Sequence, residues 1–422
     1  MYISTKTRLT LTIFLEYAAW GSYLTSMGIY LASVNMGNSI GWFYAAQGVV
    51  SLFMPALMGL VADKWIQAQR LFRLCHLFSA IFMLLLAFRC MNGDVSFMSI
   101  FPLYFCSVAL FMPTVALCNS ICYSTFTRQG YDPVSAFPPI RLWGTVGFIL
   151  SMWAVNFMGY QDSYMQFVLR AVIGILLVLF AFSLPECPIV KNDAKNKLSS
   201  RLGLKSLSLF KTKEMAIFFI FSMLLGVCLQ ITNGYAGPYI DSFAVQTEFS
   251  GNFFVKNSIL LISLSQISEI FCMLLLPFFI RKFGFKRVFL ISMIAWALRF
   301  ALLGWGDPDK GIWLFIVSMA VYGVAFDFFN IAGSIFVERN TDSANRSSAQ
   351  GLFMMMANGF GASIGMVFAQ KIVNVFTGSV FFNERYYTVG DWNTIWFVFA
   401  SFALLLALSF AVIFKSKRKL SK

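Results

Sequence analysis

Apolar runs of about 20 or more residues recur along this 422-residue chain, and each is long enough to cross a hydrocarbon core about 30 Å thick. Only 12% of the residues are charged and 59% are hydrophobic, whereas soluble domains have about a quarter charged and about half apolar residues. Backbone groups in lipid must be hydrogen-bonded within their own segment, and no strand-like alternation is seen, so we expect only helices. The sequence predicts an all-α membrane protein without a separate soluble domain.

Twelve transmembrane helices can be drawn, at 9–34, 39–62, 71–91, 96–127, 138–159, 164–185, 213–243, 252–280, 287–306, 311–337, 347–376 and 392–414. The first follows Lys6 and Arg8 as a signal peptide would. It is too long for a secretory hydrophobic region, and no Ala-x-Ala cleavage pattern follows it. We therefore expect a retained first helix.

The basic residues behind the net charge of +14 cluster in short loops on one side of these spans. The opposite loops and nearby helix ends hold only Arg89, Lys256, Lys310, Lys371 and Arg385. The positive-inside rule then places both termini and the central loop in the cytoplasm. Because the charge is distributed as a topology signal, we expect no nucleic-acid partner.

The central basic loop, 186–212, divides the spans into six and six, within 1–185 and 213–422. Two such six-helix bundles form the layout of major facilitator transporters. The stretch "GLVADK", which ends in Asp63 and Lys64, resembles the signature that this superfamily has in the same loop. We expect Asp63 and Lys64 to act in gating, and an ordinary charged turn is the alternative.

A charge in the middle of a membrane costs about 2.5 kcal/mol or more on insertion scales. At about 1.5 Å per residue, Asp327 lies roughly 24 Å into its helix and Glu269 is similarly deep, so neither can reach the membrane surface. Arg170 and Arg299 are long enough to reach a partner or an interface, so a structural role is equally open for them. The charged residues within the spans that need a reason for this cost are Glu16, Arg141, Arg170, Glu269, Arg299 and Asp327.

Polar residues also share helix faces, since residues three or four apart lie on one side. We expect these faces to converge on a wet cavity. The alternative, polar contacts between helices at about 0.6 kcal/mol each, explains an amide well but two buried carboxylates poorly. Arg141, near the cytoplasmic end of its span, could instead extend to the membrane surface. The faces are Arg141, Thr145 and Phe148; Gln230 and Asn233; Gln266 and Glu269; and Asp327 and Asn330.

Helix-breaking residues follow one of these faces. Gly234, Gly237 and Pro238 come just after Gln230 and Asn233, so we expect a kink or an unwound turn there, as at many transport sites. Aromatic faces, amides and a guanidinium suit a ring with a hydroxylated appendage, and a carboxyl group removed from water can bind and release a proton near neutral pH. The residues alone predict proton-driven uptake of a small polar solute.

An integral membrane enzyme or a sensor is the alternative from another class. The eight cysteines show no CxxC pair or metal-ligand spacing, and the single histidine, His76, has no predicted partner. An enzyme needs a nucleophile, a base or a metal set, and a sensor normally carries an output domain. We therefore expect no catalytic residue, no cofactor and no metal.

The stretches "FMPALMGLVADKW", "FPPIRLWGTVGFI", "LQITN", "SQISE", "YGVAFDFFNIAGSIFVE" and "SAQGLFMMMANGFG" occur in order along nearly the whole chain. With them the sequence resembles the nucleoside:proton symporters of the major facilitator superfamily. The resemblance implies proton-driven uptake of purine and pyrimidine nucleosides across a bacterial inner membrane, with alternating access to a site between the two halves. A sugar or another polar solute is the alternative cargo. We expect a monomer in the bilayer.

The resemblance also implies site residues. Substrate contacts are expected from Arg141, Thr145, Phe148, Gln230, Asn233, Gln266, Glu269, Tyr322, Phe326, Asp327 and Asn330. Proton coupling is expected from Asp327 or Glu269. Glu16 is a third candidate, because the resembled pattern has a neutral Gln where this chain has an acid.

Overall fold

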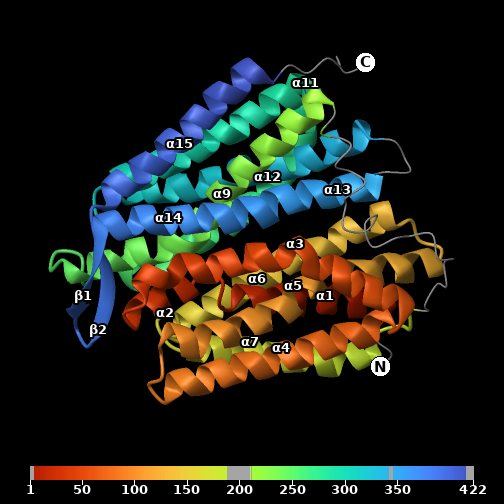
Figure 1. Ribbon diagram of the computed structural model, residues 1–422, viewed down its shortest axis with the longest axis horizontal. Helices are drawn as coiled ribbons and strands as arrows, with labels where there is room; N and C mark the ends of the chain where they lie inside the picture. Colours follow the sequence, from red (N-terminus) through yellow and green to blue (C-terminus); the bar gives the residue numbers. More distant parts are fainter. Residues whose placement is uncertain (1–3, 188–209, 211, 342–345, 415–422) are drawn as a thin grey trace.

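A computed structural model of the chain describes residues 4–187, 210, 212–341 and 346–414. Within these ranges the fold is mainly helical, and ten segments are long and apolar enough to cross a membrane (Figure 1). The predicted helical membrane protein is confirmed.

The helices before residue 188 fall in one group and the later ones in another (Figure 1). The first group contains α1 (Thr5–Gly21), α2 (Met27–Ser33), α3 (Ile40–Lys64), α4 (Ala68–Met91), α5 (Phe97–Arg128), α6 (Pro133–Phe157) and α7 (Met165–Phe180), with 3-10 turns at Gly37–Ser39 and Ala181–Ser183. The second group contains α9 (Lys213–Ser242), a 3-10 turn at Phe243–Val245, α10 (Phe253–Lys256), α11 (Ser258–Trp305), α12 (Ile312–Arg339), α13 (Arg346–Met354), the π-helix η6 (Met355–Gly361), α14 (Ala362–Phe376) and α15 (Trp392–Ile413).

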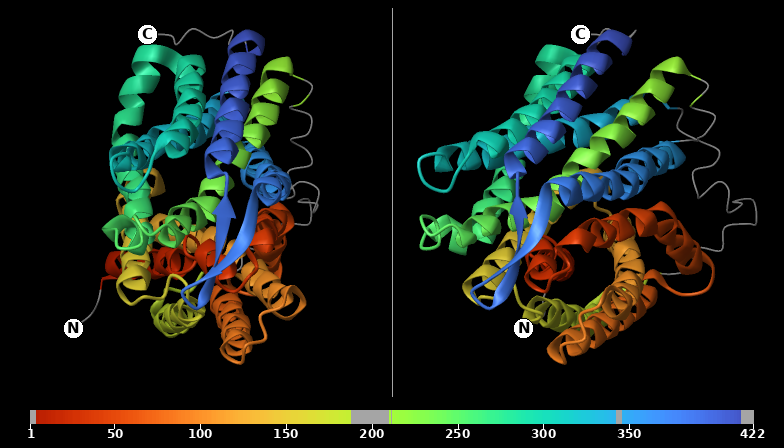
Figure 2. Two further views of the ribbon diagram at one scale, coloured as in Figure 1. Left: turned by 90° about the vertical axis from the view of Figure 1, so that its left-hand side faces the viewer. Right: turned by 60° about the vertical axis from the view of Figure 1, so that its left-hand side comes forward.

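Several predicted spans differ in detail from the observed helices. The predicted first helix, 9–34, is two helices, because the chain turns between Gly21 and Met27. The helix α11 contains two predicted spans, which are separated at Gly284 (Figure 2). Gly284 has φ 75° and ψ 167°, a conformation that a residue with a Cβ rarely adopts.

The expectation of helices alone is wrong between α14 and α15. Strands β1 (Thr377–Phe382) and β2 (Arg385–Gly390) form an antiparallel hairpin. Asn383 and Glu384 connect them with φ 46° and 64°, the positive values that a tight hairpin turn requires. Val, Thr and aromatic residues on both sides of this turn are the signal that the sequence analysis missed.

Of the two alternatives expected in α9, a kink or an unwound turn, the unwound turn is wrong, since the helix continues through Gly234, Gly237 and Pro238. These small residues instead allow a close helix contact. A Cβ placed on Gly28 of α2 would lie 2.4 Å from the carbonyl oxygen of Gly234 and 3.1 Å from Pro238 Cγ. The two helix groups therefore meet at this point almost backbone to backbone.

Contacts between the two groups gather toward the end of the molecule that carries the β-hairpin, which we call the hairpin end (Figure 1). Trp153 Nε1 donates a hydrogen bond of 2.8 Å to Ser263 Oγ, and Asn156 Nδ2 donates one of 2.7 Å to Asn257 Oδ1. The backbone N–H of Gly41 donates to Gln370 Oε1. The opposite end, where α1 begins and α15 ends, we call the linker end.

Candidate functional site

A charge cluster lies between the two helix groups. Glu269 on α11 and Asp327 on α12 are 6% and 1% exposed. They interact electrostatically with each other and with Arg141 on α6. Asp327 Oδ2 is buried without a hydrogen-bond partner in the described part of the chain. One guanidinium from the first group and two carboxyl groups from the second thus share one site.

The guanidinium of Arg141 is held by an aromatic ring. It lies over the ring of Tyr17 on α1, 4.0 Å from the ring centroid, and the whole residue is half-buried. Cation–π contacts of this kind leave the guanidinium N–H groups free to donate in the plane. Arg141 can therefore donate hydrogen bonds to the carboxyl groups and to a ligand from the same position.

The two other predicted residues of α6 are buried, and Phe148 lies against α1. Thr145 and Phe148 are 4% and 7% exposed. The Phe148 ring makes an edge contact with Trp20 at a centroid distance of 6.4 Å. A Cβ on Gly21 would lie 2.5 Å from the Phe148 carbonyl oxygen, so α1 and α6 approach closely here.

The predicted amides of α9 and α11 are half-buried, which leaves part of each side chain accessible. Asn233 Nδ2 donates to Gln230 Oε1 at 3.3 Å, so these two residues form a pair on one helix face. Gln266 lies within hydrogen-bonding reach of the Tyr322 hydroxyl. Tyr322 in turn stacks on Phe326, with ring centroids 5.6 Å apart and 11° between the planes.

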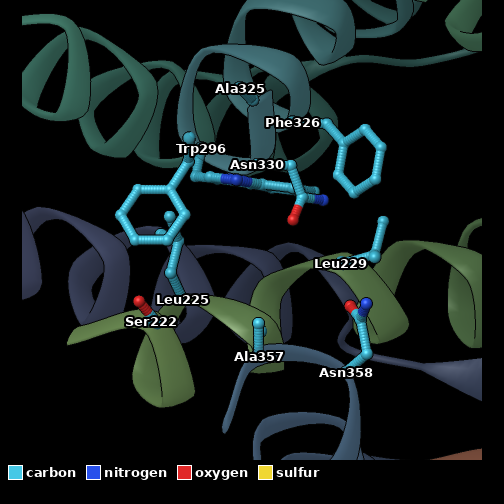
Figure 3. Close-up of a pocket in the computed structure, with 11 residues that line it drawn as sticks. Ser222, Leu225, Leu229, Trp296, Ala325, Phe326, Asn330, Ala357 and Asn358 are labelled. Carbon is cyan, nitrogen blue, oxygen red and sulfur yellow. The ribbon is translucent and has the colours of Figure 1, made fainter. Parts of the chain in front are cut away.

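A pocket lies beside these residues in the second helix group, between α9, α11, α12 and η6 (Figure 3). The amides of Asn330 and Asn358 project into it from facing walls, and Trp296 also lines it. Phe326 forms another wall. The sequence analysis missed Trp296 and Asn358, although "ANGFG" in an apolar run, which contains Asn358, is a polar signal of the kind it used elsewhere.

The remaining buried arginines have local partners. Arg299 donates to the Ser318 carbonyl oxygen at 2.6 Å and lies over the Tyr322 ring at 4.9 Å. Arg170 donates to Ser79 Oγ at 2.6 Å and lies over the Phe111 ring at 4.9 Å. Both side chains are buried, with 0% of Arg170 and 1% of Arg299 exposed.

Glu16 lies in the first helix group and contacts His76, with 2.7 Å between Glu16 Oε2 and His76 Nε2. The expectation that His76 has no partner is therefore wrong. The two residues are 60 positions apart, and no local pattern links them. Lys64 is exposed at the end of α3, whereas the side chain of Asp63 lies outside the described residues.

Half-buried polar groups and a charge cluster that two helix groups of a membrane protein share are typical of a solute transporter. The family profile described as nucleoside H+ symporter matches residues 3–419. The chain belongs to the nucleoside H+ symporter family.

Known relatives agree with this assignment. The nucleoside permease NupG of Escherichia coli is 43% identical over 98% of this chain and 96% of its own length. The xanthosine permease of the same organism is 44% identical over 98% of this chain and 96% of its own length. A crystal structure of the nucleoside transporter NupG superposes with a TM-score of 0.87 at 42% identity, covering 98% of this chain and all of that one.

Proposed function

We propose that this protein takes up purine and pyrimidine nucleosides together with protons across a bacterial inner membrane. The observation that carries the proposal is the interaction of Arg141 from one helix group with Glu269 and Asp327 from the other. A ligand bound at this cluster contacts both groups, so its binding and release can be coupled to their relative movement.

The moving units are residues 1–185 and 213–422, joined by the linker 186–212, in a major facilitator fold. We count α1 with α2 as one membrane crossing, the two arms of α11 as two, and α13, η6 and α14 as one, which makes twelve. The basic loops place both termini and the linker in the cytoplasm. The protein works as a monomer within the bilayer.

The contacts between the helix groups at the hairpin end correspond to closure toward the outside. The hydrogen bonds Trp153–Ser263 and Asn156–Asn257 support this assignment. The state described here would thus expose the site to the cytoplasm. Asp63 and Lys64, at the linker end of α3, are positioned to act as a latch when that end closes instead.

The nucleoside binds among the polar faces around the cluster. Amides can pair with the base edge, the guanidinium and carboxyl groups can hydrogen-bond the ribose hydroxyls, and the stacked pair of Tyr322 and Phe326 can hold a ring. The residues proposed to contact substrate are Arg141, Thr145, Phe148, Gln230, Asn233, Gln266, Glu269, Tyr322, Phe326, Asp327 and Asn330.

Charge balance explains the coupling. One guanidinium and two carboxylates carry a net charge of about −1, and closing a low-dielectric site around an unbalanced charge is costly. A proton on Asp327 or Glu269 makes the cluster neutral. Loading this proton together with the nucleoside then permits the helix groups to change position.

Uptake of labelled uridine into right-side-out vesicles tests the proposal. We expect accumulation that a protonophore abolishes and that unlabelled adenosine inhibits by competition. Uptake that is indifferent to the proton gradient would contradict the coupling. Competition by sugars but not by nucleosides would favour the alternative cargo.

A further inference from the structure

A second buried acid–base group lies in the first helix group, away from Asp327. Glu16 on α1 and His76 on α4 are 1% and 0% exposed, and 2.7 Å separates Glu16 Oε2 from His76 Nε2. Thr114 on α5 lies 2.6 Å from the other carboxyl oxygen, Glu16 Oε1. Three helices therefore converge on one carboxyl group.

The contacts of Thr114 show where a proton can be held. Thr114 Oγ1 lies 2.6 Å from Glu16 Oε1 and also 2.6 Å from the Phe111 carbonyl oxygen. A hydroxyl has one hydrogen, so it cannot donate to both acceptors. When Glu16 is protonated on Oε1, it donates to Thr114, and the hydroxyl donates to Phe111. Both contacts are then hydrogen bonds.

His76 completes this pattern without carrying the extra proton. Neutral His76 with its hydrogen on Nε2 donates to Glu16 Oε2, whether or not Oε1 is protonated. His76 Nδ1 is buried and has no hydrogen-bond partner among the described residues. A protonated imidazole would leave an N–H unpaired there, which is unfavourable in a buried site. The acceptor for the proton is thus Glu16, and His76 is a positioning residue.

Other ionisable groups of the first helix group interact electrostatically with Glu16. Arg170 is the buried cation of the same helix group and interacts electrostatically with Glu16. Tyr17 interacts with both Glu16 and Arg141, and so connects this site to the charge cluster between the two helix groups. These groups are Tyr17 on α1, Cys75 on α4, Cys118 on α5 and Arg170 on α7.

We propose that Glu16, His76 and Thr114 form a second proton-binding site, which takes up one proton on Glu16 from the outside and releases it inside in every cycle. This inference rests on the proposed proton-coupled uptake and adds a second coupled proton to the one on Asp327 or Glu269. The second proton changes the accumulation of nucleoside at equilibrium. With the membrane potential held at zero, each coupled proton multiplies the accumulation at equilibrium by about ten per pH unit of gradient.

The experiment measures the accumulation ratio of a labelled nucleoside in vesicles with a gradient of one pH unit and the potential clamped by potassium and valinomycin. We expect about 100-fold accumulation for the unmutated protein and about 10-fold for Glu16→Gln. Nucleoside exchange without a gradient verifies that the variant is folded and binds substrate. Ser107→Ala, at a buried polar residue of the same helix group, should retain about 100-fold accumulation.

Two further variants test the proposal even if the protein with Glu16→Gln does not fold. Thr114→Val removes the acceptor of the Glu16 proton but keeps the carboxyl group, and should lower accumulation toward about 10-fold. His76→Gln keeps an N–H donor for Glu16 and should retain about 100-fold. About 100-fold accumulation by Glu16→Gln or by Thr114→Val, or about 10-fold by the unmutated protein, would overturn the second site. Absence of any gradient-dependent accumulation by the unmutated protein would instead overturn the proposed coupling itself.

Discussion

Arg385 on the β-hairpin connects both helix groups, because its guanidinium lies 3.0 Å from Asp162 Oδ2 in the first group and 2.8 Å from Asp241 Oδ1 in the second. Its Nε also donates to the Tyr387 hydroxyl at 2.8 Å. Burial alone would lower the pKa of Arg385, but Asp241 and Asp162 outweigh it and the pKa is raised. The arginine therefore stays charged and bridges the two helix groups at the hairpin end.

Arg385→Ala should weaken this closure, since Asp241, which is 3% exposed, is left without its cation. We expect a cysteine introduced at Asn257, on the contact surface of the hairpin end, to react several-fold faster with a membrane-impermeant maleimide when Arg385 is absent. Arg385→Lys, which keeps one charge but not the two-sided contact, should have a smaller effect. Equal labelling rates in all three backgrounds would show that Arg385 does not hold this end.

Asp327→Asn should remove the part of nucleoside accumulation that is coupled to the proton of the charge cluster, because the amide cannot take up that proton, and should leave only the accumulation of about 10-fold per pH unit that is coupled to Glu16. Exchange of nucleoside across the membrane without a gradient should persist at a reduced rate. The matched control is Asp309→Asn, at an exposed aspartate between α11 and α12. Near-normal accumulation by Asp327→Asn would remove this residue from the coupling mechanism.

Arg141→Lys should lower nucleoside affinity by about tenfold or more, because an ammonium cannot reproduce the planar donors over the Tyr17 ring. Thermal stabilisation of the purified protein by a series of nucleosides measures this affinity. Arg89→Lys, at an exposed arginine, serves as the control. An affinity that Arg141→Lys leaves unchanged would argue against a direct contact with substrate.

The pocket beside the cluster should contribute to base selection, because Asn330 and Asn358 present amides to it next to the Trp296 ring. Asn358→Leu should raise KM by about three- to tenfold, consistent with loss of a hydrogen bond of about 1 kcal/mol, and unequally for purine and pyrimidine nucleosides. The measurement compares the KM values for adenosine and uridine between the variant and the unmutated protein. Equal, unchanged values would exclude the pocket from recognition.

Substitutions at two glycines distinguish an effect on the closure between the helix groups from an effect on folding. Gly28→Ala should push the hairpin end open, because the new Cβ would lie 2.4 Å from the Gly234 carbonyl oxygen across the two groups. Gly226→Ala places a Cβ 1.9 Å from the Ala357 carbonyl oxygen within one group, and should lower the unfolding temperature instead. Maleimide labelling at Asn257 and thermal unfolding distinguish the two outcomes. Similar effects of both substitutions on both measurements would contradict this distinction.

Much of the candidate site is predicted from the sequence. Mid-span carboxylates are costly, so Glu269 and Asp327 were identifiable from depth alone, and residues three or four apart on a helix indicated Gln230 with Asn233 and Gln266 with Glu269. Arg141 was a candidate from its helix face. That it interacts with two carboxyl groups on other helices was not deducible, because helix packing decides which faces meet.

The sequence by itself determined that the chain is a helical membrane protein, because length and hydrophobicity of a segment act locally on its own backbone. Only the tertiary structure determined which residues that are distant in the sequence contact each other. Glu16 meets His76 across 60 positions, and Arg385 meets Asp241 across 144. Local rules describe neighbours within a few residues, whereas contacts of this range exist only after the helices and the β-hairpin have packed together.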